Sequence, residues 1–172
     1  MTVTLRELDG GPEDLAALQR VLEGASGYKQ RVTGHPVGPA DAQSLFSALP
    51  PDLGYDAKHV LAVELDGDVI GVVDLLDGWP DPQTAHVGLL LLDEPHQQLG
   101  IGGQIWQQIE ALLRSWPHVN TARAAVVETN VQVLPFWLRC GFRDTGERKP
   151  YTYDKVVSRS IVLDRPVGRM HV

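Results

Sequence analysis

The chain has 172 residues, which suits one domain around a single core, and its 43% hydrophobic and 22% charged residues exclude a largely disordered chain. Its net charge of −7 argues against a nucleic-acid partner, which requires a basic surface. No apolar run approaches the roughly 18 residues needed to cross a bilayer, and the first residues lack a signal-peptide pattern. We therefore expect one cytoplasmic domain over residues 1–172, with no membrane partner.

The first part of the chain predicts a strand followed by two helices. A short strand is expected at Val3–Leu8, and a helix begins near Pro12, with acids in its first turn and leucines at helical spacing. The glycine-rich segment Gly24–Gly38 is predicted to be a loop. A second short helix over residues 42–49 is ended by Pro50.

The middle of the chain predicts three strands and a longer helix. Val60–Leu65 and Val69–Leu76 flank Asp66-Gly67, a dipeptide typical of a tight hairpin turn. A third strand is expected at Ala85–Leu92. Apolar residues at helical spacing then predict an amphipathic helix over residues 101–116.

The last part predicts a strand, a helix and two closing strands. Ala122–Val127 is a strand, and residues 133–138 form a second apolar helical face. Phe142–Glu147 and Val156–Leu163 are closing strands around a polar loop, RKPYTYD, at 148–154. The order βααβββαβαββ indicates an α/β domain with a mixed sheet.

A glycine-containing turn joins the strand that ends at Leu92 to the helix that follows. The unpaired N–H groups of a helix start can bind a phosphate, and glycines let it approach the backbone. No Gly-Lys-Ser/Thr follows, which excludes a Walker loop, and Ile105 occupies the third glycine position of a dinucleotide-binding fingerprint. Taken alone, the turn is equally consistent with a purely structural helix start.

Two motifs give the turn a more specific meaning. Gln97-x-x-Gly100-x-Gly102 resembles the Gln/Arg-x-x-Gly-x-Gly/Ala signature of the GNAT superfamily of acyl-CoA-dependent N-acetyltransferases. Some 30 residues on, the segment from Asn130 to Phe142, with two aromatics and Gly-Phe, resembles the second motif of that superfamily. The predicted order of elements is also similar to that fold, so the resemblance covers nearly the whole chain.

The resemblance implies that acetyl-CoA is the acyl donor, and it implies which residues bind it. Its pyrophosphate would lie on the amides of Gln98–Gly103, with Arg139 or Arg143 as further phosphate contacts. The strand at Leu90–Leu92 would leave its neighbour and pair with pantetheine, with the amide of Leu92 facing the thioester carbonyl. The cofactor-binding residues implied in this way are Leu90, Leu91, Leu92, Gln97, Gln98, Leu99, Gly100, Ile101, Gly102, Gly103, Asn130 and Trp137.

The second motif departs from the superfamily pattern at one position. Many members place there a Tyr that protonates the departing thiolate, whereas this chain has Trp137, whose indole only donates hydrogen bonds. Tyr151 or Tyr153 could supply the proton instead, or each could simply cover the edge of the core. A thiolate with a pKa of about 8.5 could also leave unaided.

Three residues are candidates for the base that deprotonates the attacking amine. Asp74 interrupts an apolar run, His86 lies at the start of the cofactor strand, and Glu128 follows the next strand. Each could instead be a structural or solvent-facing residue. We name Asp74, His86 and Tyr151 as the candidate catalytic residues, with Glu128 as a weaker alternative.

Neither metal chemistry nor a covalent intermediate is indicated. The single cysteine, Cys140, excludes an internal disulfide, and it lacks an evident His or Asn relay, so we interpret it as a packed thiol. The histidines and carboxylates show no metal-ligand spacing such as His-Glu-x-x-His, and we expect no metal.

Charge gives a first hint about the acceptor. Residues 1–99 hold 5 Lys and Arg against 16 Asp and Glu, a net charge of −11, whereas residues 100–172 carry +4. The basic part suits an anionic cofactor, and the acidic part favours a cationic, polyamine-like amine, unless the surface charge is merely uneven.

Together these features predict an N-acetyltransferase in which a small primary amine attacks acetyl-CoA directly in a ternary complex. The amine would lie between the first two helices with their Gly24–Gly38 connection and the RKPYTYD loop. The alternative is a non-catalytic acyl-CoA-binding module, which the tryptophan at position 137 favours. A homodimer is common among the proteins that the chain resembles.

Overall fold

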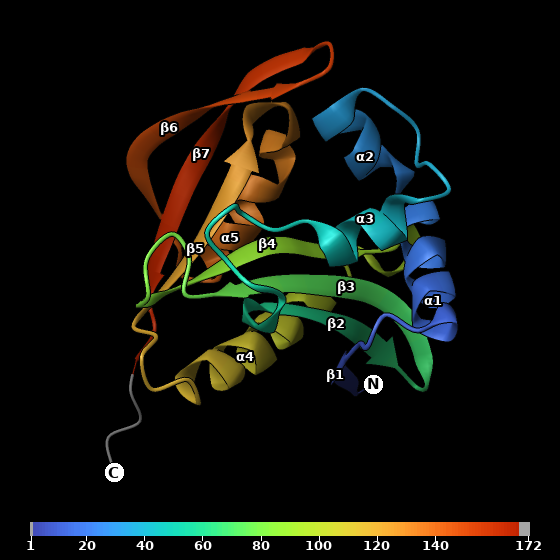
Figure 1. Cartoon of the computed structure of the whole chain (residues 1–172), viewed down its shortest axis with the longest axis horizontal. Coiled ribbons are helices and arrows are strands. Elements are labelled where there is room, and N and C mark those ends of the chain that lie inside the picture. Colours follow the sequence, from blue (N-terminus) through green and yellow to red (C-terminus); the bar gives the residue numbers. More distant parts are fainter. Residues whose placement is uncertain (1, 169–172) are drawn as a thin grey trace.

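The computed structural model describes residues 2–168 and contains one seven-stranded sheet with helices on both faces (Figure 1). The strands are β1 (Val3–Glu7), β2 (Lys58–Leu65), β3 (Asp68–Asp77), β4 (Thr84–Leu92), β5 (Thr121–Val127), β6 (Arg143–Tyr153) and β7 (Val156–Pro166). The helices are α1 (Pro12–Glu23), α2 (Ser26–Thr33), α3 (Asp41–Ser47), α4 (Ile101–Arg114) and α5 (Leu134–Arg139). Short 3₁₀ segments are η1 (Tyr55–Ala57), η2 (Glu94–His96) and η3 (Glu128–Val133).

The sheet is mixed, as expected, with the strand order β1-β2-β3-β4-β5-β7-β6. Its pairs are antiparallel except for β4 and β5, which run parallel. Helix α4 covers one face with an apolar stripe, and α1 and α3 cover part of the other face (Figure 1). Both faces of β3 and β4 are therefore buried over part of their length, which explains their continuous apolar sequences.

The sheet divides where β4 and β5 meet. The two strands pair only from Thr84 to Val87 and from Thr121 to Ala124, and beyond these residues they separate. The separation predicted for Leu90–Leu92 is therefore present, and it begins earlier, at Gly88. Half of the backbone groups of the two strands are left without a strand partner along this gap.

A β-bulge lies on β4 where the separation begins. Asp74 pairs with Leu89 and Leu75 pairs with Val87, so Gly88 is the extra residue. A Cβ atom at position 88 would lie 3.1 Å from Oδ2 of Asp74. Glycine therefore allows the Asp74 carboxylate to lie directly against the backbone of the bulge.

The predicted Gly24–Gly38 loop is wrong, because the segment contains helix α2. Its glycines cluster near the two ends of the helix, and residues 28–33 contain no glycine or proline that would interrupt it. Gly34 ends α2 in the left-handed conformation with φ of 73°, which a glycine adopts without strain. The order of elements is consequently βαααβββαβαββ.

The predicted RKPYTYD loop is also wrong, because strand β6 continues through it to Tyr153. β6 is an edge strand, so the missing N–H of Pro150 need not be paired on its outer side. The pairing of β6 with β7 shifts register between Asp144 and Arg148, where Gly146 has φ of 83°. Regular pairing resumes at Arg148. The resulting β6–β7 hairpin extends toward α2 (Figure 1).

Candidate active-site cleft

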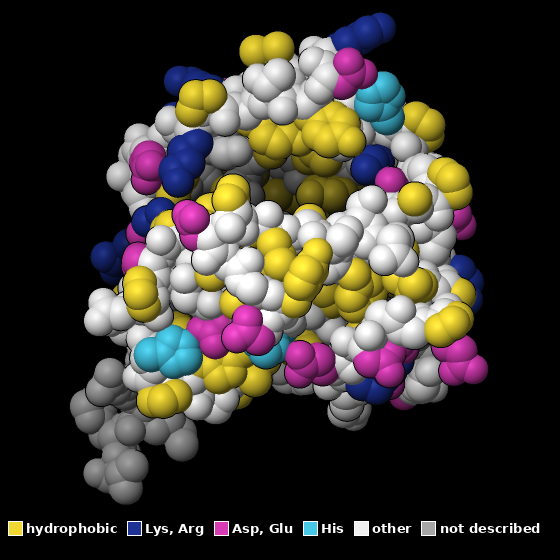
Figure 2. All heavy atoms as spheres, viewed as in Figure 1, with side chains coloured by type: hydrophobic (Ala, Val, Ile, Leu, Met, Phe, Trp, Pro, Cys, Tyr) yellow, Lys and Arg dark blue, Asp and Glu magenta, His cyan; other side chains and the backbone are white. Residues whose placement is uncertain are grey.

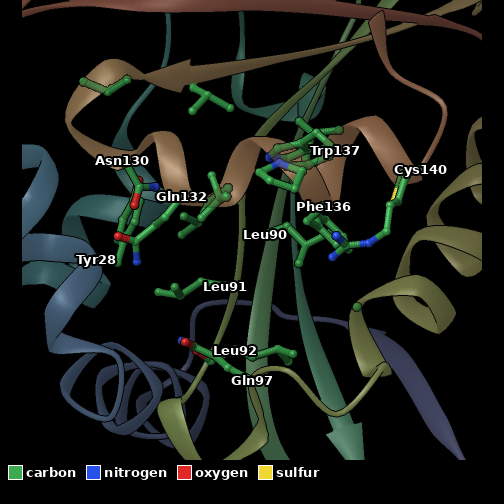
Figure 3. A pocket seen from close by; sticks show the side chains of 18 of the residues that line it. Tyr28, Leu90, Leu91, Leu92, Gln97, Asn130, Gln132, Phe136, Trp137 and Cys140 are labelled. Carbon is green, nitrogen blue, oxygen red and sulfur yellow. The ribbon is translucent and has the colours of Figure 1, made fainter.

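The separation of β4 and β5 opens a cleft with a volume of about 660 Å³. Residues of α2, β4, the glycine turn, β5, η3 and α5 line it, and it is seen as a hollow beneath the β6–β7 hairpin in Figure 2. Tyr28, Asn130 and Gln132 group on one side of it, and Phe136 and Trp137 lie on another (Figure 3). This volume lies within the range typical of small-molecule sites.

One wall of the cleft is the open edge of β4. The amide of Asp93 donates to the carbonyl oxygen of Ile70 on β3, and backbone groups point to alternate sides along a strand. The amides of Leu90 and Leu92 therefore face the gap toward β5. They can donate hydrogen bonds to an extended ligand that lies where a neighbouring strand would lie.

The glycine turn forms one end of the cleft. Gln98 and Gly100 have left-handed φ values of 61° and 77°, and α4 begins immediately after them. The first amides of α4 have no partner within the helix, and Gly102 and Gly103 line the cleft. The positive end of the helix dipole and these amides provide a site for an anion such as a phosphate.

The two glycines of this helical turn have different roles. A Cβ atom at position 102 would lie 2.7 Å from Cε2 of Phe136, so Gly102 permits close packing of α5 on α4. A Cβ atom at position 103 would meet nothing within 4 Å. Gly103 therefore leaves space for a ligand, whereas Gly102 leaves space for a side chain of the protein itself.

Ten of the twelve predicted cofactor-binding residues line the cleft, and two do not. Leu99 points outward with 58% exposure, and Ile101 is buried in the core beneath α4. Only their backbone groups remain available to a ligand. The residues that line the cleft are Leu90, Leu91, Leu92, Gln97, Gln98, Gly100, Gly102, Gly103, Asn130 and Trp137.

Gln97 and Asn130 shape the cleft through their side-chain amides. Nε2 of Gln97 donates to the carbonyl oxygen of Leu92 at 2.8 Å, which fixes the turn after β4. Oδ1 of the buried Asn130 accepts a hydrogen bond from Nε of Arg31 at 2.6 Å, which joins α2 to η3. Since Arg31 only donates, this contact leaves the Nδ2 donor of Asn130 for another partner.

Trp137 is part of an aromatic cluster. It is 7% exposed, and its ring centre lies 5.3 Å from that of Phe136 and 5.0 Å from that of Phe142. The side chain is thus a packed wall of the cleft. Of the two predicted phosphate contacts, Arg139 lines the cleft, whereas Arg143 lies exposed on β6 and does not.

Asp74 lies beneath the bulge, next to the cleft but not among its lining residues. Its carboxylate forms an ion pair with Lys58 at 3.0 Å, and both side chains are about nine-tenths buried or more. Its second oxygen, Oδ1, is buried without a hydrogen-bond partner. Burial raises the pKa of Asp74, and the charge of Lys58 opposes this rise.

His86 lies under the loop between β3 and β4, away from the residues that line the cleft. Its ring packs edge-on against Trp79 with centroids 4.8 Å apart, and its Nδ1 atom is buried without a partner. Burial, with a smaller effect of Arg123, lowers the pKa of His86 to about 4. The imidazole is consequently neutral near pH 7.

The remaining candidate acid and base residues do not line the cleft. Glu128 forms an ion pair with Arg159 at 2.9 Å. The hydroxyl of Tyr151 donates to the carbonyl oxygen of Val32 at 2.6 Å, which ties the hairpin to α2. Tyr153 is 46% exposed and lies below the ammonium group of Lys29.

Three lining residues of α2, Tyr28, Arg31 and Val32, were not predicted individually from the sequence as functional. The hydroxyl of Tyr28 has no hydrogen-bond partner among residues 2–168, and burial raises its pKa to about 12. The sequence placed the amine beside the segment that contains them, Gly24–Gly38, but that segment was predicted to be a loop and no side chain in it was named.

The acidic residues of the first part of the chain do not line the cleft. Its lining contains no Asp or Glu, and its charged residues are Arg31 and Arg139. The argument from composition for a cationic acceptor therefore has no support in the cleft. Among residues 2–168, no group of three or more His, Cys, Asp and Glu could hold a metal ion, and no helix is long and apolar enough to cross a membrane.

A comparison with known protein families identifies the class of enzyme to which the chain belongs. Residues 28–142 match the model of the acetyltransferase (GNAT) family, which covers well over half of the chain. The protein is therefore an enzyme, an acyl-CoA-dependent acyltransferase, and the alternative of a non-catalytic module is set aside. The chain belongs to the GNAT family of acetyltransferases, as the two sequence motifs predicted.

Solved structures share the fold over nearly the whole chain. An acetyltransferase from Thermus thermophilus is 23% identical, with a TM-score of 0.76 and coverage of 96% of this chain and 97% of that one. A spermidine N-acetyltransferase from Vibrio cholerae, in complex with CoA and spermine, is 15% identical, with a TM-score of 0.72 and coverage of 96% and 95%. The ribosomal-protein-S18-alanine N-acetyltransferase from Escherichia coli is 16% identical, with a TM-score of 0.66 and coverage of 99% and 97%. A comparison with curated proteins returned no match.

Proposed function

We propose that the protein transfers the acetyl group of acetyl-CoA to the primary amine of a small molecule, with both substrates in the cleft at once. The observation that carries this proposal is the open edge of β4. The amides of Leu90 and Leu92 face a cleft that reaches the free amides of the glycine turn. An extended ligand with a phosphate at one end fits both features.

The donor half of the cleft suits the chemistry of coenzyme A. The amides from Gln98 to Gly103 would hold the pyrophosphate, with Arg139 beside them. The free Nδ2 donor of Asn130 and the amides on β4 would hold the pantetheine arm. Acetyl-CoA supplies a thioester, so the amine nitrogen bonds to the carbonyl carbon while the C–S bond breaks and its electron pair leaves with sulfur.

The lining residues favour direct attack over an acyl-enzyme intermediate. Among the residues that line the cleft none is Ser or Thr, and the one thiol is that of Cys140. Burial raises the pKa of Cys140, which keeps it protonated and weakly nucleophilic near pH 7. The amine itself is then the nucleophile.

Asp74 is the proposed base. Gly88 has no side chain between the cleft and Oδ2 of Asp74, so the proton of the amine can reach the carboxylate directly or through water. A carboxylate with a raised pKa is a stronger base than a solvated one. His86 and Glu128 lack such a path, because their contacts lie outside the lining of the cleft.

The names of the structural neighbours span different acceptors, a polyamine in one and a protein alanine in another. The fold thus admits more than one amine class. Support for a small molecule comes from the roof of the cleft, because α2 and the β6–β7 hairpin are joined above it by Tyr151 and Val32.

The test is initial-velocity kinetics with acetyl-CoA and a panel of primary amines, following thiol release and the acetylated product. We expect lines that intersect when both substrates are varied, because both must be bound before reaction. Parallel lines would indicate an acyl-enzyme and contradict direct attack. Binding of acetyl-CoA without transfer to any amine would contradict the proposed function.

A further inference from the structure

The distribution of charge around the cleft bears on the acceptor. Of the 16 Asp and Glu in residues 1–99, none lines the cleft, whereas Arg31 from the same acidic half does. Figure 2 shows acidic side chains gathered below the hollow, whose interior is largely apolar. A polycationic amine would therefore meet the cation of Arg31 among the lining residues, and the carboxylate beside the lining, that of Asp74, is already paired with Lys58.

Arg31 holds its guanidinium in the cleft through a single contact. Its Nε donates to Oδ1 of Asn130 at 2.6 Å, and its Nη groups have no hydrogen-bond partner among residues 2–168. No Asp or Glu in that part of the chain forms an ion pair with it. A guanidinium has five N–H donors, so most of them remain available to a ligand.

One carboxylate, that of Glu94, lies near Arg31 without forming an ion pair with it. A Cβ atom at position 27 would lie 2.9 Å from Nη1 of Arg31 and 3.4 Å from Oε1 of Glu94. The carboxylate of Glu94 instead accepts the amide of Gly27 at 3.4 Å. Glu94 thus lies beside the backbone of α2 without forming an ion pair with the arginine.

A carboxylate is the group that fits these free donors. The planar guanidinium can bind both oxygens of a carboxylate at once, and this pairing is strong where water is partly excluded. The pantetheine arm of acetyl-CoA carries no charge, and its phosphates are accounted for by the glycine turn and Arg139 at another part of the cleft. The unmatched charge of Arg31 is therefore left for the acceptor.

We propose that the acceptor is a primary amine that also carries a carboxylate, in the manner of an amino acid, and that Arg31 binds the carboxylate. The amine would then be directed toward the bulge at Gly88 and the base Asp74. This assignment rests on the proposed acetyl transfer and names the substrate class of the same site.

The experiment compares matched acceptors that differ only in charge. Amino acids, their carboxamides and spermine are assayed for acetylation, and their binding to the CoA-loaded protein is measured by calorimetry. We expect kcat/KM to be about 10- to 100-fold higher for an amino acid than for its carboxamide, as charge-assisted hydrogen bonds allow. Spermine should bind more weakly than either.

Variants test whether Arg31 causes the preference for a carboxylated amine. Arg31→Gln should remove about 10- to 100-fold of kcat/KM for the amino acid and little for the carboxamide, and Arg31→Lys should be intermediate because an ammonium cannot bind both oxygens. The matched control is Lys29→Gln, which removes a cation of the same helix that pairs with Asp41 at 3.1 Å. This variant should keep the wild-type preference.

Each outcome is decisive. Carboxamides or spermine used as well as or better than amino acids would overturn the proposed substrate class. So would the absence of both reaction and binding with every carboxylated amine. Neither result would contradict acetyl transfer, which the initial-velocity kinetics test separately. An increase in the KM of acetyl-CoA alone in Arg31→Gln would assign Arg31 to the donor and also overturn the proposal. A protein that does not bind acetyl-CoA would instead refute the proposed function.

Discussion

At the scale of single residues, the cleft depends on polar groups that are buried or half-buried and incompletely paired. Asp74 has one oxygen on Lys58 and one without a partner, and Tyr28 has a hydroxyl without a partner among residues 2–168. Incomplete pairing of buried groups is costly for the fold, so these positions are where a function is to be expected.

The role of Asp74 is tested by removing its charge. Asp74→Asn should lower kcat by about 10²–10⁴-fold and leave the KM of acetyl-CoA nearly unchanged, because a base acts on the amine. The single variant also leaves Lys58 buried without a counter-charge, which destabilises a fold by about 3–5 kcal/mol. The double variant Asp74→Asn/Lys58→Gln removes both charges and serves as the folding control. A folded double variant with near-normal kcat would show that the base lies elsewhere.

Tyr28 and Tyr151 should respond differently to the same change. With a pKa of about 12, the Tyr28 hydroxyl stays a hydrogen-bond donor throughout the assay range, so it can stabilise the departing sulfur. Tyr28→Phe should lower kcat without shifting the alkaline limb of the pH–rate profile. An unchanged kcat in Tyr28→Phe would show that Tyr28 does not assist the departure of the thiolate.

Tyr151→Phe should lower the free energy of unfolding by about 1 kcal/mol, since it removes the hydrogen bond to the carbonyl oxygen of Val32.

At the scale of elements, the glycine turn and the start of α4 make a site that can be altered without altering the fold. Position 103 is the third residue of the helix, where an acidic side chain suits the helix dipole, and the space beside it is open. Position 102 offers no such freedom, because of its approach to Phe136.

Gly103→Asp should therefore weaken acetyl-CoA binding at least tenfold, an effect of about 1.4 kcal/mol or more, while the free protein keeps its stability. In the wild type, acetyl-CoA at about 100 times its Kd should add roughly 2.7 kcal/mol to the free energy of unfolding. Thermal shift measures both effects. Gln107→Asp, an exposed position of α4 outside the cleft, is the control with the same charge. An undiminished thermal shift in Gly103→Asp would place the phosphates elsewhere.

The same elements show what local sequence could and could not predict. The strand, turn and helix around Gly100 follow from apolar spacing and glycine, both of which act locally. The donor side was predicted from the resemblance of the two motifs to the GNAT superfamily. Helix α2 was missed because glycines at both ends of a short helix resemble a loop. The continuation of strand β6 through residues 148–153 was missed because a proline is tolerated only once a strand is known to lie at an edge.

The sequence placed the acceptor between the segments 24–38 and 148–154, but the side-chain contacts there could not be predicted because they join distant segments. Arg31 lies against Asn130, which is 99 positions away, and Tyr151 lies against Val32, which is 119 positions away. Neither pairing leaves a periodicity or a spacing in the sequence. The position of Asp74 in an apolar run was evident in the sequence, but Gly88, the glycine that lies between Asp74 and the cleft, belongs to a different strand.

At the scale of the whole molecule, the sheet consists of two halves joined over a short distance. One half contains β1 to β4 and the other contains β5, β7 and β6, and four parallel residue pairs connect them. Contacts above the cleft provide the second connection, among them Tyr151 with Val32 and His35 with Asp154 at 2.6 Å. The cleft lies between the two connections.

An interior strand edge without a partner has a consequence for solvent exchange. The amide hydrogens of Leu90 and Leu92 face the gap in the free protein, whereas that of Leu91 is directed toward β3. Deuterium should therefore replace the hydrogens at positions 90 and 92 quickly and the one at position 91 slowly, in an alternation that residue-resolved exchange can detect. Saturating acetyl-CoA should slow positions 90 and 92 to the rate of position 91. Persistence of the alternation in the loaded protein would mean that the ligand does not complete the sheet.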